Sequence, residues 1–314
     1  SIAKVRAGDY PYPTDYNDHF ETPARAYEDI LPLVQYILAK KKKQNKGNET
    51  IIYDPYYCTG RAATLLDGVF QKRRSKTISS RIRIKHEQRD FYRDIQQQSF
   101  PKYDILITNP PYSESHKERC LDFAVDQLKK HGRPFFLVMP NYVATKEYFK
   151  RKIEFSGSKK IQLFYVIPSA NHPYEYDHPE GTGHQVSPFA SVWFCGLSYR
   201  EGKADDVKSV RDAFTKFHSS YASSQMGAPR IATSLQELIH IGGVSGERRK
   251  NPRQRRKMRQ QAMQRTNDAM GGDIASAACK GSQSFMSNSK RKSFGGAEHS
   301  RKERSDNKKR KFQR

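Results

Sequence analysis

The sequence predicts an α/β protein with a mostly parallel sheet and helices on both of its faces. Three observations predict it. Short apolar runs alternate with amphipathic helical patterns between residues 22 and 155, turn-forming residues stand at many of the junctions, and two apolar runs within 160–199 follow without a helix between them. The last two runs predict an antiparallel hairpin at the end of the sheet.

The first element is an amphipathic helix. Thr22 is a suitable N-cap, Pro23 suits the first helical position, and Lys40–Lys43 stand where cations complement the helix dipole. A strand at 51–53 leads through a turn to a second helix, which begins after Gly60 and carries its apolar residues within 62–70. These two helices and the strand open the predicted α/β arrangement.

The following elements continue the alternation. We predict strands around 82–84 and 105–107, a helix around 120–128, a strand at 133–141, a helix at 142–155, and strands at 160–168 and 189–199 joined by a loop, 169–188. Residues 1–200 are therefore predicted to form the main domain. Residues 201–246 are mixed in character and are expected to add a helix or two packed on the core, and 247–314 form a separate tail.

The tail holds most of the excess positive charge of this 314-residue, +24 chain. Residues 247–314 contain 21 Lys and Arg against six Asp and Glu, among many Gly, Ser, Gln and Asn residues. Such a segment buries too little apolar surface to fold, so we predict disorder. A basic tail favours polyanions such as nucleic acid, and its alternative role is to keep the protein in solution. The runs near Arg248–Arg259 and Lys308–Lys311 resemble nuclear or nucleolar targeting signals.

Cysteine usage predicts an intracellular protein. Cys58, Cys120, Cys195 and Cys279 are widely spaced, which argues against a disulfide framework and a structural zinc site. No apolar run is long enough to span a membrane. The chain begins at Ser1 and not at Met, so the sequence leaves a preceding targeting segment open.

The run "ITNPPY" marks the candidate catalytic residues Asn109, Pro110, Pro111 and Tyr112. Pro110 cannot donate to a sheet ladder, so the strand ends there. Ligands bind at the carboxyl ends of strands in open parallel sheets, which places an amide, a rigid backbone and an aromatic ring at such an edge. The alternative is a strand-end cap followed by a core aromatic residue.

A second signal, "DPYYCTG" (Asp54–Gly60), follows the first strand and opens a helix. Alone it also fits an ordinary turn. Together with "TP" before it and "NPPY" after it, it resembles the class I S-adenosylmethionine-dependent amino-methyltransferases over residues 15–200. The resemblance implies a Rossmann-like fold and an exocyclic adenine nitrogen or a glutamine amide as the methyl acceptor. The order of the motifs matches the adenine-modifying branch.

The resemblance also implies cofactor-binding roles. Thr22 and Pro23 match the segment that closes over the methionine end of S-adenosylmethionine, and Asp54, Pro55 and Gly60 match the cofactor turn. The chain departs from the family at Cys58, which stands where the first glycine of the turn is expected. Glu87 matches the ribose-binding acid and Asp90 the acid near the adenine ring, although the family usually has a helix between them. A solvated turn acid is the alternative for Glu87.

An amide oxygen and rigid prolines suit methyl transfer to such a nitrogen. The lone pair of an exocyclic amino group is delocalised, so a site must accept its hydrogens to localise it. Asn109 and the Pro110 carbonyl would accept them, and Tyr112 would stack on the target. Such a mechanism needs no strong general base, and a base within a duplex would have to be flipped out.

Further residues are candidates for substrate binding. The loop 169–188 holds His172, His178 and His184, and we expect His172 and His184 to contact substrate, with a plain loop as the alternative. No local element brings these histidines to one face, so we predict no metal site. Lys146 and Lys150 are placed to contact phosphates, unless they belong to an ordinary solvated helix face.

We therefore predict an S-adenosylmethionine-dependent adenine-N6 methyltransferase that acts on DNA or RNA, with a protein partner for target recognition as a possibility. The first alternative is a protein glutamine-N5 methyltransferase. The second is a catalytically inactive RNA-binding or ribosome-assembly protein on the same fold, which Cys58 and the short spacing of Glu87 and Asp90 favour.

Overall fold

The computed structural model describes residues 18–43, 49–72, 81–154, 161–176, 190–198, 205–219, 227–241 and 244. All of them lie in one compact unit, Ser1–Arg249. A second unit, Lys250–Arg314, lies outside the described residues. The predicted disordered tail, both basic targeting runs, His178, His184 and Cys279 therefore lie outside the described part of the chain.

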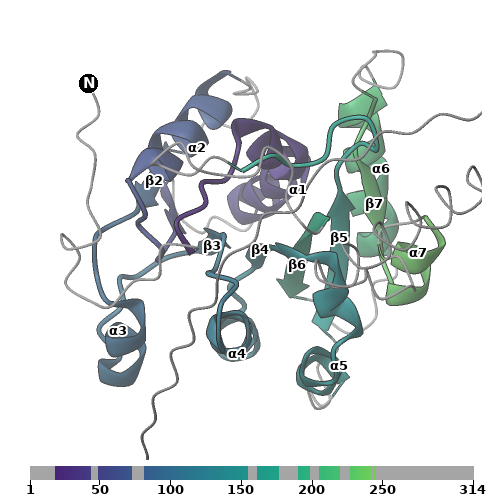
Figure 1. Cartoon of the computed structure of the whole chain (residues 1–314). Coiled ribbons are helices and arrows are strands. Elements are labelled where there is room, and N and C mark those ends of the chain that lie inside the picture. The colour runs from purple at the N-terminus through teal and green to yellow at the C-terminus, as the bar shows by residue number, and fades with distance from the viewer. Residues whose placement is uncertain are drawn as a thin grey trace, which may run out of the picture. The chain divides into compact units, whose positions relative to one another are not determined.

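Helices and strands alternate through the described unit (Figure 1). In chain order they are α1 (Ala24–Lys43), β1 (Glu49–Tyr53), α2 (Arg61–Lys72), β2 (Arg81–Lys85), α3 (Phe91–Gln97), β3 (Ile105–Thr108), α4 (His116–His131), β4 (Phe135–Pro140), the 3-10 helix η3 (Asn141–Thr145), α5 (Glu147–Glu154), β5 (Ile161–Ile167), β6 (Ser191–Ser198), α6 (Asp205–His218), β7 (Arg230–Ala232) and α7 (Leu235–His240).

The strands form one sheet in the order β2-β1-β3-β4-β6-β5-β7. The pairs β1–β2, β1–β3 and β3–β4 are parallel, and β4–β6, β5–β6 and β5–β7 are antiparallel. Only β6 and β7 therefore run against the other described strands. The predicted α/β class, the mostly parallel sheet and the antiparallel β5–β6 pair are confirmed. The strand order places β6 between β4 and β5.

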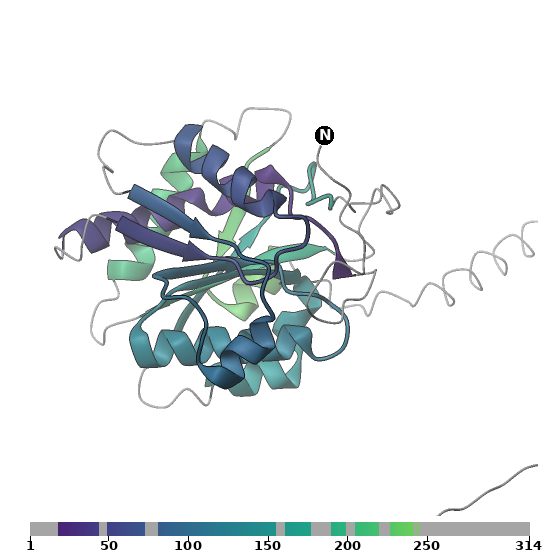
Figure 2. The same cartoon turned by 90° about the vertical axis from the view of Figure 1, so that its left-hand side faces the viewer.

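Side chains from alternate positions of each strand pack under different helices. In β4, Phe136 and Val138 join a core with α1, α2 and α6, whereas Phe135, Leu137 and Met139 join a core with α3, α4, α5 and α7. The two helical layers enclose the sheet in Figure 2. The continuous apolar run of β4 is typical of a parallel strand that is covered on both faces.

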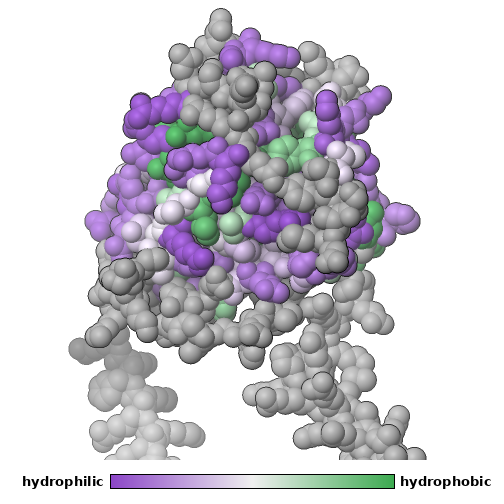
Figure 3. Space-filling view, turned by 90° about the horizontal axis from the view of Figure 1, so that it is seen from above, coloured by the Kyte–Doolittle hydropathy of each residue, from purple (hydrophilic) through white to green (hydrophobic). Residues whose placement is uncertain are grey.

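The segment after β6 extends the sheet and one helical layer. Val210 and Phe214 of α6 are buried in the core that α1 contributes to, and β7 pairs with β5 at the edge of the sheet. Hydrophilic side chains occupy much of the described surface when the molecule is seen from above (Figure 3). This segment is thus part of the same packed layers as residues 18–198.

Three local predictions differ from the structure. α1 begins at Ala24, because the first-turn bond runs from Ala26 N to Pro23 O at 3.0 Å, so Pro23 precedes the helix. The helix predicted at 142–155 is broken into η3 and α5 at Lys146, which has an extended backbone. The Thr145 hydroxyl donates to Tyr142 O at 2.8 Å, a local bond that competes with helical structure. Helix α3 was not predicted.

Three further findings concern the described residues. Cys58, Cys120 and Cys195 form no disulfide bond with one another. In the described ranges, no group of three or more His, Cys, Asp and Glu side chains is arranged to hold a metal ion. No helix of the described part combines the length and apolar character needed to cross a membrane.

Candidate active site

The candidate site lies where the strand order reverses. The chain passes from β1 to β2 on one side and then returns to β3 on the other side of β1. In open α/β sheets, a crevice for ligands forms outside the carboxyl ends of the strands at such a switch point. Asp54 follows β1 and Asn109 follows β3, so the fold brings the two halves of the predicted site to this edge.

Asp54 is buried and anchors this edge. Its Oδ1 accepts a bond from the Thr108 hydroxyl at 2.5 Å and a longer bond from the Tyr56 backbone N–H at 3.3 Å. Burial raises the pKa of Asp54, and His86, whose Nδ1 lies 3.6 Å from Oδ2, opposes that rise. Because Thr108 is the last residue of β3, the carboxylate ties the ends of β1 and β3 together.

The turn after Asp54 contains two residues with left-handed backbones. Gly60 has a φ of +84°, and a Cβ at this position would lie 2.8 Å from the Tyr57 hydroxyl oxygen. Cys58 has a φ of 48°, a conformation that favours glycine. The left-handed backbone favours glycine at both position 58 and position 60, and the chain has glycine at position 60 only. Burial raises the pKa of the Cys58 thiol to about 12, which keeps it protonated at neutral pH.

Asn109 presents an unsatisfied acceptor. Its side-chain Nδ2 donates to the Phe20 carbonyl oxygen at 3.1 Å, which fixes the orientation of the amide. Its Oδ1 is buried and has no hydrogen-bond partner among the described residues. A buried acceptor without a partner costs about 1–3 kcal/mol, and native proteins tolerate few of them. The amide is thus held with its oxygen available to a donor that a ligand would bring.

Residues 18–22, which we call the N-terminal strap, lie across both halves of the site. The Asp18 carboxylate accepts from Ser113 N at 3.2 Å and from the Ser113 hydroxyl at 2.5 Å. The Glu21 carboxylate accepts from the Thr59 hydroxyl and from Arg61 at 3.3 Å. The strap therefore bonds to the turn between β1 and α2, to the start of α2 and to the loop after β3 at the same time.

A cavity of about 80 Å³ remains beneath the strap. It is lined by Asp18, His19, Phe20, Glu21, Thr22, Tyr27, Asp54, Tyr56, Tyr57, Cys58, Ala62, Asn109 and Pro111. The described lining includes three carboxylates and several aromatic rings, and none of these described residues is Lys or Arg. Such a wall favours a positively charged ligand. Small-molecule sites usually measure about 300–1,000 Å³, so a ligand of that size requires the strap to move.

The remaining residues of the proline motif have separate positions. Pro111 lines the cavity, whereas Pro110 is buried. The Tyr112 hydroxyl donates to Val138 O at 3.1 Å, and the ring does not line the cavity. Burial raises the pKa of this hydroxyl, so it remains a neutral donor. The stacking of Tyr112 on a target remains a prediction, and it would take place outside this cavity.

The structure places the two predicted acids outside the cavity. Glu87 is exposed and pairs with Lys85 at 3.2 Å and Arg89 at 3.8 Å. Asp90 is the N-cap of α3 and accepts from the backbone N–H groups of Tyr92 and Arg93 at 3.0 Å. Pro23, Pro55 and Gly60 do not line the cavity either, whereas Thr22, Asp54 and Asn109 do.

His86 is a residue that the sequence reasoning did not single out. Its side chain is 1% exposed, its Nδ1 lies 3.1 Å from the Asp54 carbonyl oxygen, and its ring stacks on Tyr57 at 5.1 Å between centroids. Its Nε2 is buried without a hydrogen-bond partner among the described residues. In the sequence, His86 could have been found from its position directly after the strand β2, at the carboxyl end of the sheet.

The predicted substrate residues lie on other parts of the surface. Lys146 is exposed, with its Nζ 5.6 Å from the centre of the Tyr142 ring. Lys150 is half-buried and faces a different cavity, which Phe149 also lines. His172 is exposed in the loop after β5, and its backbone N–H donates to Ser169 O at 3.1 Å. His184 lies outside the described residues.

Comparisons with known proteins give structural neighbours at low similarity. No known protein family and no curated protein matches the sequence. One neighbour is a modification subunit of a putative type I restriction enzyme from Vibrio vulnificus YJ016, at 12% identity and a TM-score of 0.32, over 69% of this chain. The chain spans 57% of the length of that protein.

A second neighbour is a protein of Legionella pneumophila str. Philadelphia 1. It matches at 11% identity and a TM-score of 0.32, over 75% of this chain and 85% of its own length. Similarities at this level do not assign an activity.

Proposed function

We propose that this protein is an S-adenosylmethionine-dependent methyltransferase that modifies the N6 amino group of adenine in DNA or RNA. The observation that carries the proposal is the unsatisfied Oδ1 of Asn109, which the Phe20 carbonyl orients and the structure buries beside Asp54. An acceptor held in this way suits a substrate that arrives with N–H hydrogens.

The proposed methyl transfer requires mainly hydrogen-bond acceptors that are held in fixed positions. Asn109 Oδ1 accepts one hydrogen of the target amino group, and the Pro110 carbonyl accepts the other. Withdrawal of these hydrogens localises the lone pair on nitrogen, and acceptors that are fixed in advance need no reorganisation during the reaction. The adjacent prolines restrict the backbone that carries both acceptors.

The cavity beneath the strap fits the cofactor in its chemistry. S-adenosylmethionine, when bound, supplies a methyl group on a positively charged sulfur. Asp54 and Thr22 would hold it, and the carboxylate-rich lining complements the positive charge. Release of the strap contacts at Asn109, Ser113 and Thr59 would admit it, because the closed cavity is too small.

Adenine in a nucleic acid is the proposed target because of the charge of the chain. A formal charge of +24 favours a polyanion through counterion release. Lys146, Lys150, His172 and His184 remain predicted substrate contacts, and Glu87 and Asp90 remain predicted cofactor contacts if the loop after β2 rearranges. The roles of residues 1–200, 201–246 and 247–314 and the nuclear or nucleolar location are likewise predictions.

The test is transfer of labelled methyl groups from S-adenosylmethionine to total DNA, total RNA and a protein extract. We expect label in one nucleic acid, recovered as N6-methyladenine after digestion. Asn109→Ala should lower the rate about 100-fold or more, by analogy with loss of one preorganised polar group. Gln71→Ala, which removes an exposed amide from α2, is the matched control and should leave the rate unchanged.

Other outcomes would contradict the proposal. Label in protein would replace adenine with a glutamine amide as the target, since an amide nitrogen carries the same pair of hydrogens. Absence of label together with absence of cofactor-induced thermal stabilisation would favour a non-catalytic RNA-binding or ribosome-assembly role, because only a ligand that binds the native state raises its stability.

A further inference from the structure

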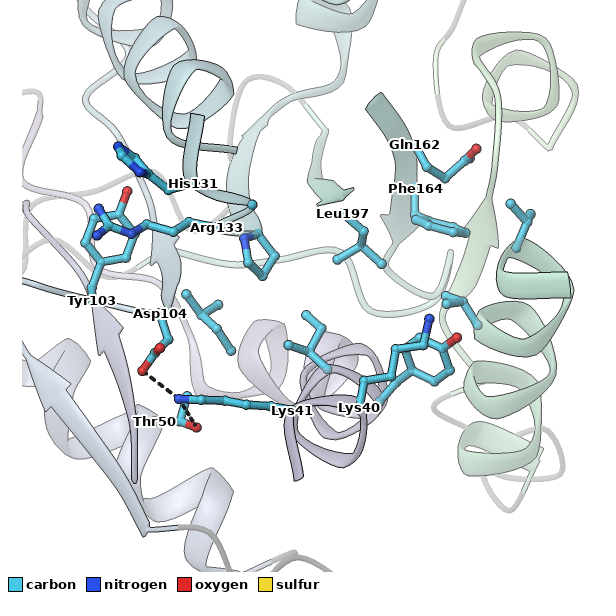
Figure 4. Close-up of a pocket in the computed structure, with 17 residues that line it drawn as sticks. Lys40, Lys41, Thr50, Tyr103, Asp104, His131, Arg133, Gln162, Phe164 and Leu197 are labelled. Carbon is cyan, nitrogen blue, oxygen red and sulfur yellow. Dashed lines mark hydrogen bonds and ion pairs between the residues drawn. The ribbon is translucent and has the colours of Figure 1, made fainter. Parts of the chain in front are cut away.

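A larger cavity lies at the opposite edge of the sheet. It measures about 410 Å³ and opens at the amino ends of β1 and β3, between α1 and α6 (Figure 4). This volume is within the range of small-molecule sites. The residues of the candidate active site do not contribute to it, so it is a separate feature of the fold.

The cavity has an apolar wall. This wall consists of side chains with no hydrogen-bonding atoms: Ile37, Ile105, Phe164, Leu197, Val207 and Val210. Figure 4 shows Phe164 and Leu197 on the side away from Tyr103. A ligand that lies against this wall must lack polar atoms there, because each unsatisfied buried polar group costs about 1–3 kcal/mol.

The other end of the cavity is polar and basic. The Arg133 guanidinium lies 4.7 Å from the centre of the Tyr103 ring (Figure 4). It also donates to Gln127 Oε1 at 2.6 Å, which holds it in place. Among the described residues, no carboxylate pairs with Arg133. By contrast, Lys41 pairs with Asp104 at 3.0 Å. The fixed charge of Arg133 is therefore available to an anion.

Tyr103, whose ring lies under the Arg133 guanidinium, gives a second indication of a ligand. Its side chain is 4% exposed, it lines the cavity, and its hydroxyl has no hydrogen-bond partner among the described residues. In Figure 4, this hydroxyl lies at the same end as Arg133. An oxyanion at that end would accept from the hydroxyl and from the guanidinium together.

We propose that this cavity binds a small amphipathic carboxylate, with the carboxylate at Arg133 and Tyr103 and a hydrophobic body against Phe164 and Leu197. A nucleotide fits less well, because the ring nitrogens and exocyclic groups of its base would face the apolar wall without partners. The proposal does not depend on the methyltransferase activity, since it uses none of the residues of the candidate active site.

The test is calorimetric titration of the full chain with 2-naphthoate as the probe. The neutral 2-naphthol, which has the same ring system without the carboxylate, and adenosine monophosphate, which carries more charge, are the comparison ligands. We expect 2-naphthoate to bind more tightly than either. Arg133→Gln should weaken it about tenfold and Tyr103→Phe a few-fold, as expected for loss of a charged and a neutral hydrogen bond.

Arg119→Gln is the matched control, because Arg119 also lies over a tyrosine ring, 3.5 Å from the centre of Tyr92, but outside this cavity. It should leave 2-naphthoate affinity unchanged. Should Arg133→Gln fail to fold, Tyr103→Phe still tests the site. Equal affinity in wild type and both cavity variants, tighter binding of adenosine monophosphate, or no binding of 2-naphthoate would each overturn the proposal.

Discussion

The cavity at the carboxyl ends of β1 and β3 measures about 80 Å³ and is lined by three carboxylates, whereas the cavity at their amino ends measures about 410 Å³ and has a fixed arginine at its polar end. The smaller cavity lies beneath the N-terminal strap, with Asn109 Oδ1 and the three carboxylates in its wall. The larger one is open and has a wide apolar wall.

This difference shows that volume alone does not locate the chemistry. Both cavities contain a buried polar atom that has no partner in the described part of the chain, Asn109 Oδ1 in one and the Tyr103 hydroxyl in the other. The first is an acceptor and suits a ligand that brings hydrogen-bond donors, in a cavity whose three carboxylates favour positive charge. The second is a donor beside a cation and suits an anion. Charge and hydrogen-bond type therefore distinguish the two cavities, and their volumes alone do not show which ligand each would favour.

Asp54→Asn is expected to have the largest effect on cofactor binding at the carboxyl end. Loss of a buried negative charge should weaken S-adenosylmethionine by on the order of tenfold to a hundredfold. In the wild type, affinity should also fall as the pH drops through the raised pKa of Asp54, because the protonated carboxyl group no longer attracts a cation. Calorimetric titration across the mildly acidic range checks both, and a flat wild-type profile would contradict the assignment.

The stability of the ligand-free protein should follow the opposite trend. The folded state binds the Asp54 proton more tightly than the unfolded chain, whose aspartate has the ordinary pKa of 3.8. The contribution of Asp54 to the free energy of unfolding is therefore fully present below that value and is lost as the pH rises through the folded pKa. Urea unfolding of wild type and Asp54→Asn should differ in this pH dependence.

Gly60→Ala is expected to lower the free energy of unfolding by about 1–2 kcal/mol, because Gly60 has a left-handed backbone. The new Cβ would also displace the Tyr57 ring and weaken cofactor binding. Gly68→Ala, in the middle of α2 with no atom within 4 Å of its Cβ, should instead stabilise the protein by about 1 kcal/mol. Thermal unfolding compares the two, and equal effects would refute the special role of the turn.

Lys41→Met tests whether Lys41, at the amino ends of the strands, stabilises the fold without a role in catalysis. Lys41 Nζ contacts Asp104 Oδ2 at 3.0 Å and donates to Glu49 O at 2.7 Å, which joins the end of α1 to the start of β1. We expect a loss of about 1–2 kcal/mol in unfolding free energy. Methyl transfer per folded molecule should not change, and an exposed-residue control, Lys130→Met, should alter neither quantity. A selective loss of activity would link the two ends.

Cys58→Gly should have the smallest effect. Relief of the left-handed backbone should raise the free energy of unfolding by about 1–2 kcal/mol. The greater flexibility of glycine in the unfolded chain should lower it again by about 0.5–1 kcal/mol. Gln98→Gly is the matched control, since Gln98 has a φ of 53° at the end of α3. Both variants should be slightly stabilised in urea unfolding, but only Cys58→Gly should change cofactor affinity. An unchanged affinity would place Cys58 away from the ligand.

Individual strands and helices show which parts of the fold the sequence patterns predict. The strands at 51–53 and 105–107 were predicted because apolar runs in parallel strands are buried on both faces, and β1 and β3 contain them. The break at Lys146 and the short helix α3 were missed. The first depends on a local bond from Thr145 to Tyr142. The second depends on capping by Asp90, the residue that the family resemblance assigns to the cofactor.

Within the candidate site, too, the sequence patterns do not predict which individual side chain makes a given contact. Glu87 was chosen because an acid closes the second strand in the family that the chain resembles. In the structure its neighbour His86 faces Asp54, whereas Glu87 pairs with Lys85 and Arg89 in solvent. Successive residues of extended chain face opposite ways, so a shift of one position exchanges the buried side chain for the exposed one. A pattern without coordinates does not resolve that difference.

The sequence by itself determined the α/β class, the strands that form the edge of the candidate site, and the placement of Asp54 and Asn109 after them, because hydrophobic periodicity and proline positions act locally. Only the tertiary structure decided that the N-terminal strap orients Asn109, that His86 lies behind Asp54, and that a basic cavity forms at the far edge. These features depend on residues far apart in the sequence, whose meeting is set by the packing of whole layers.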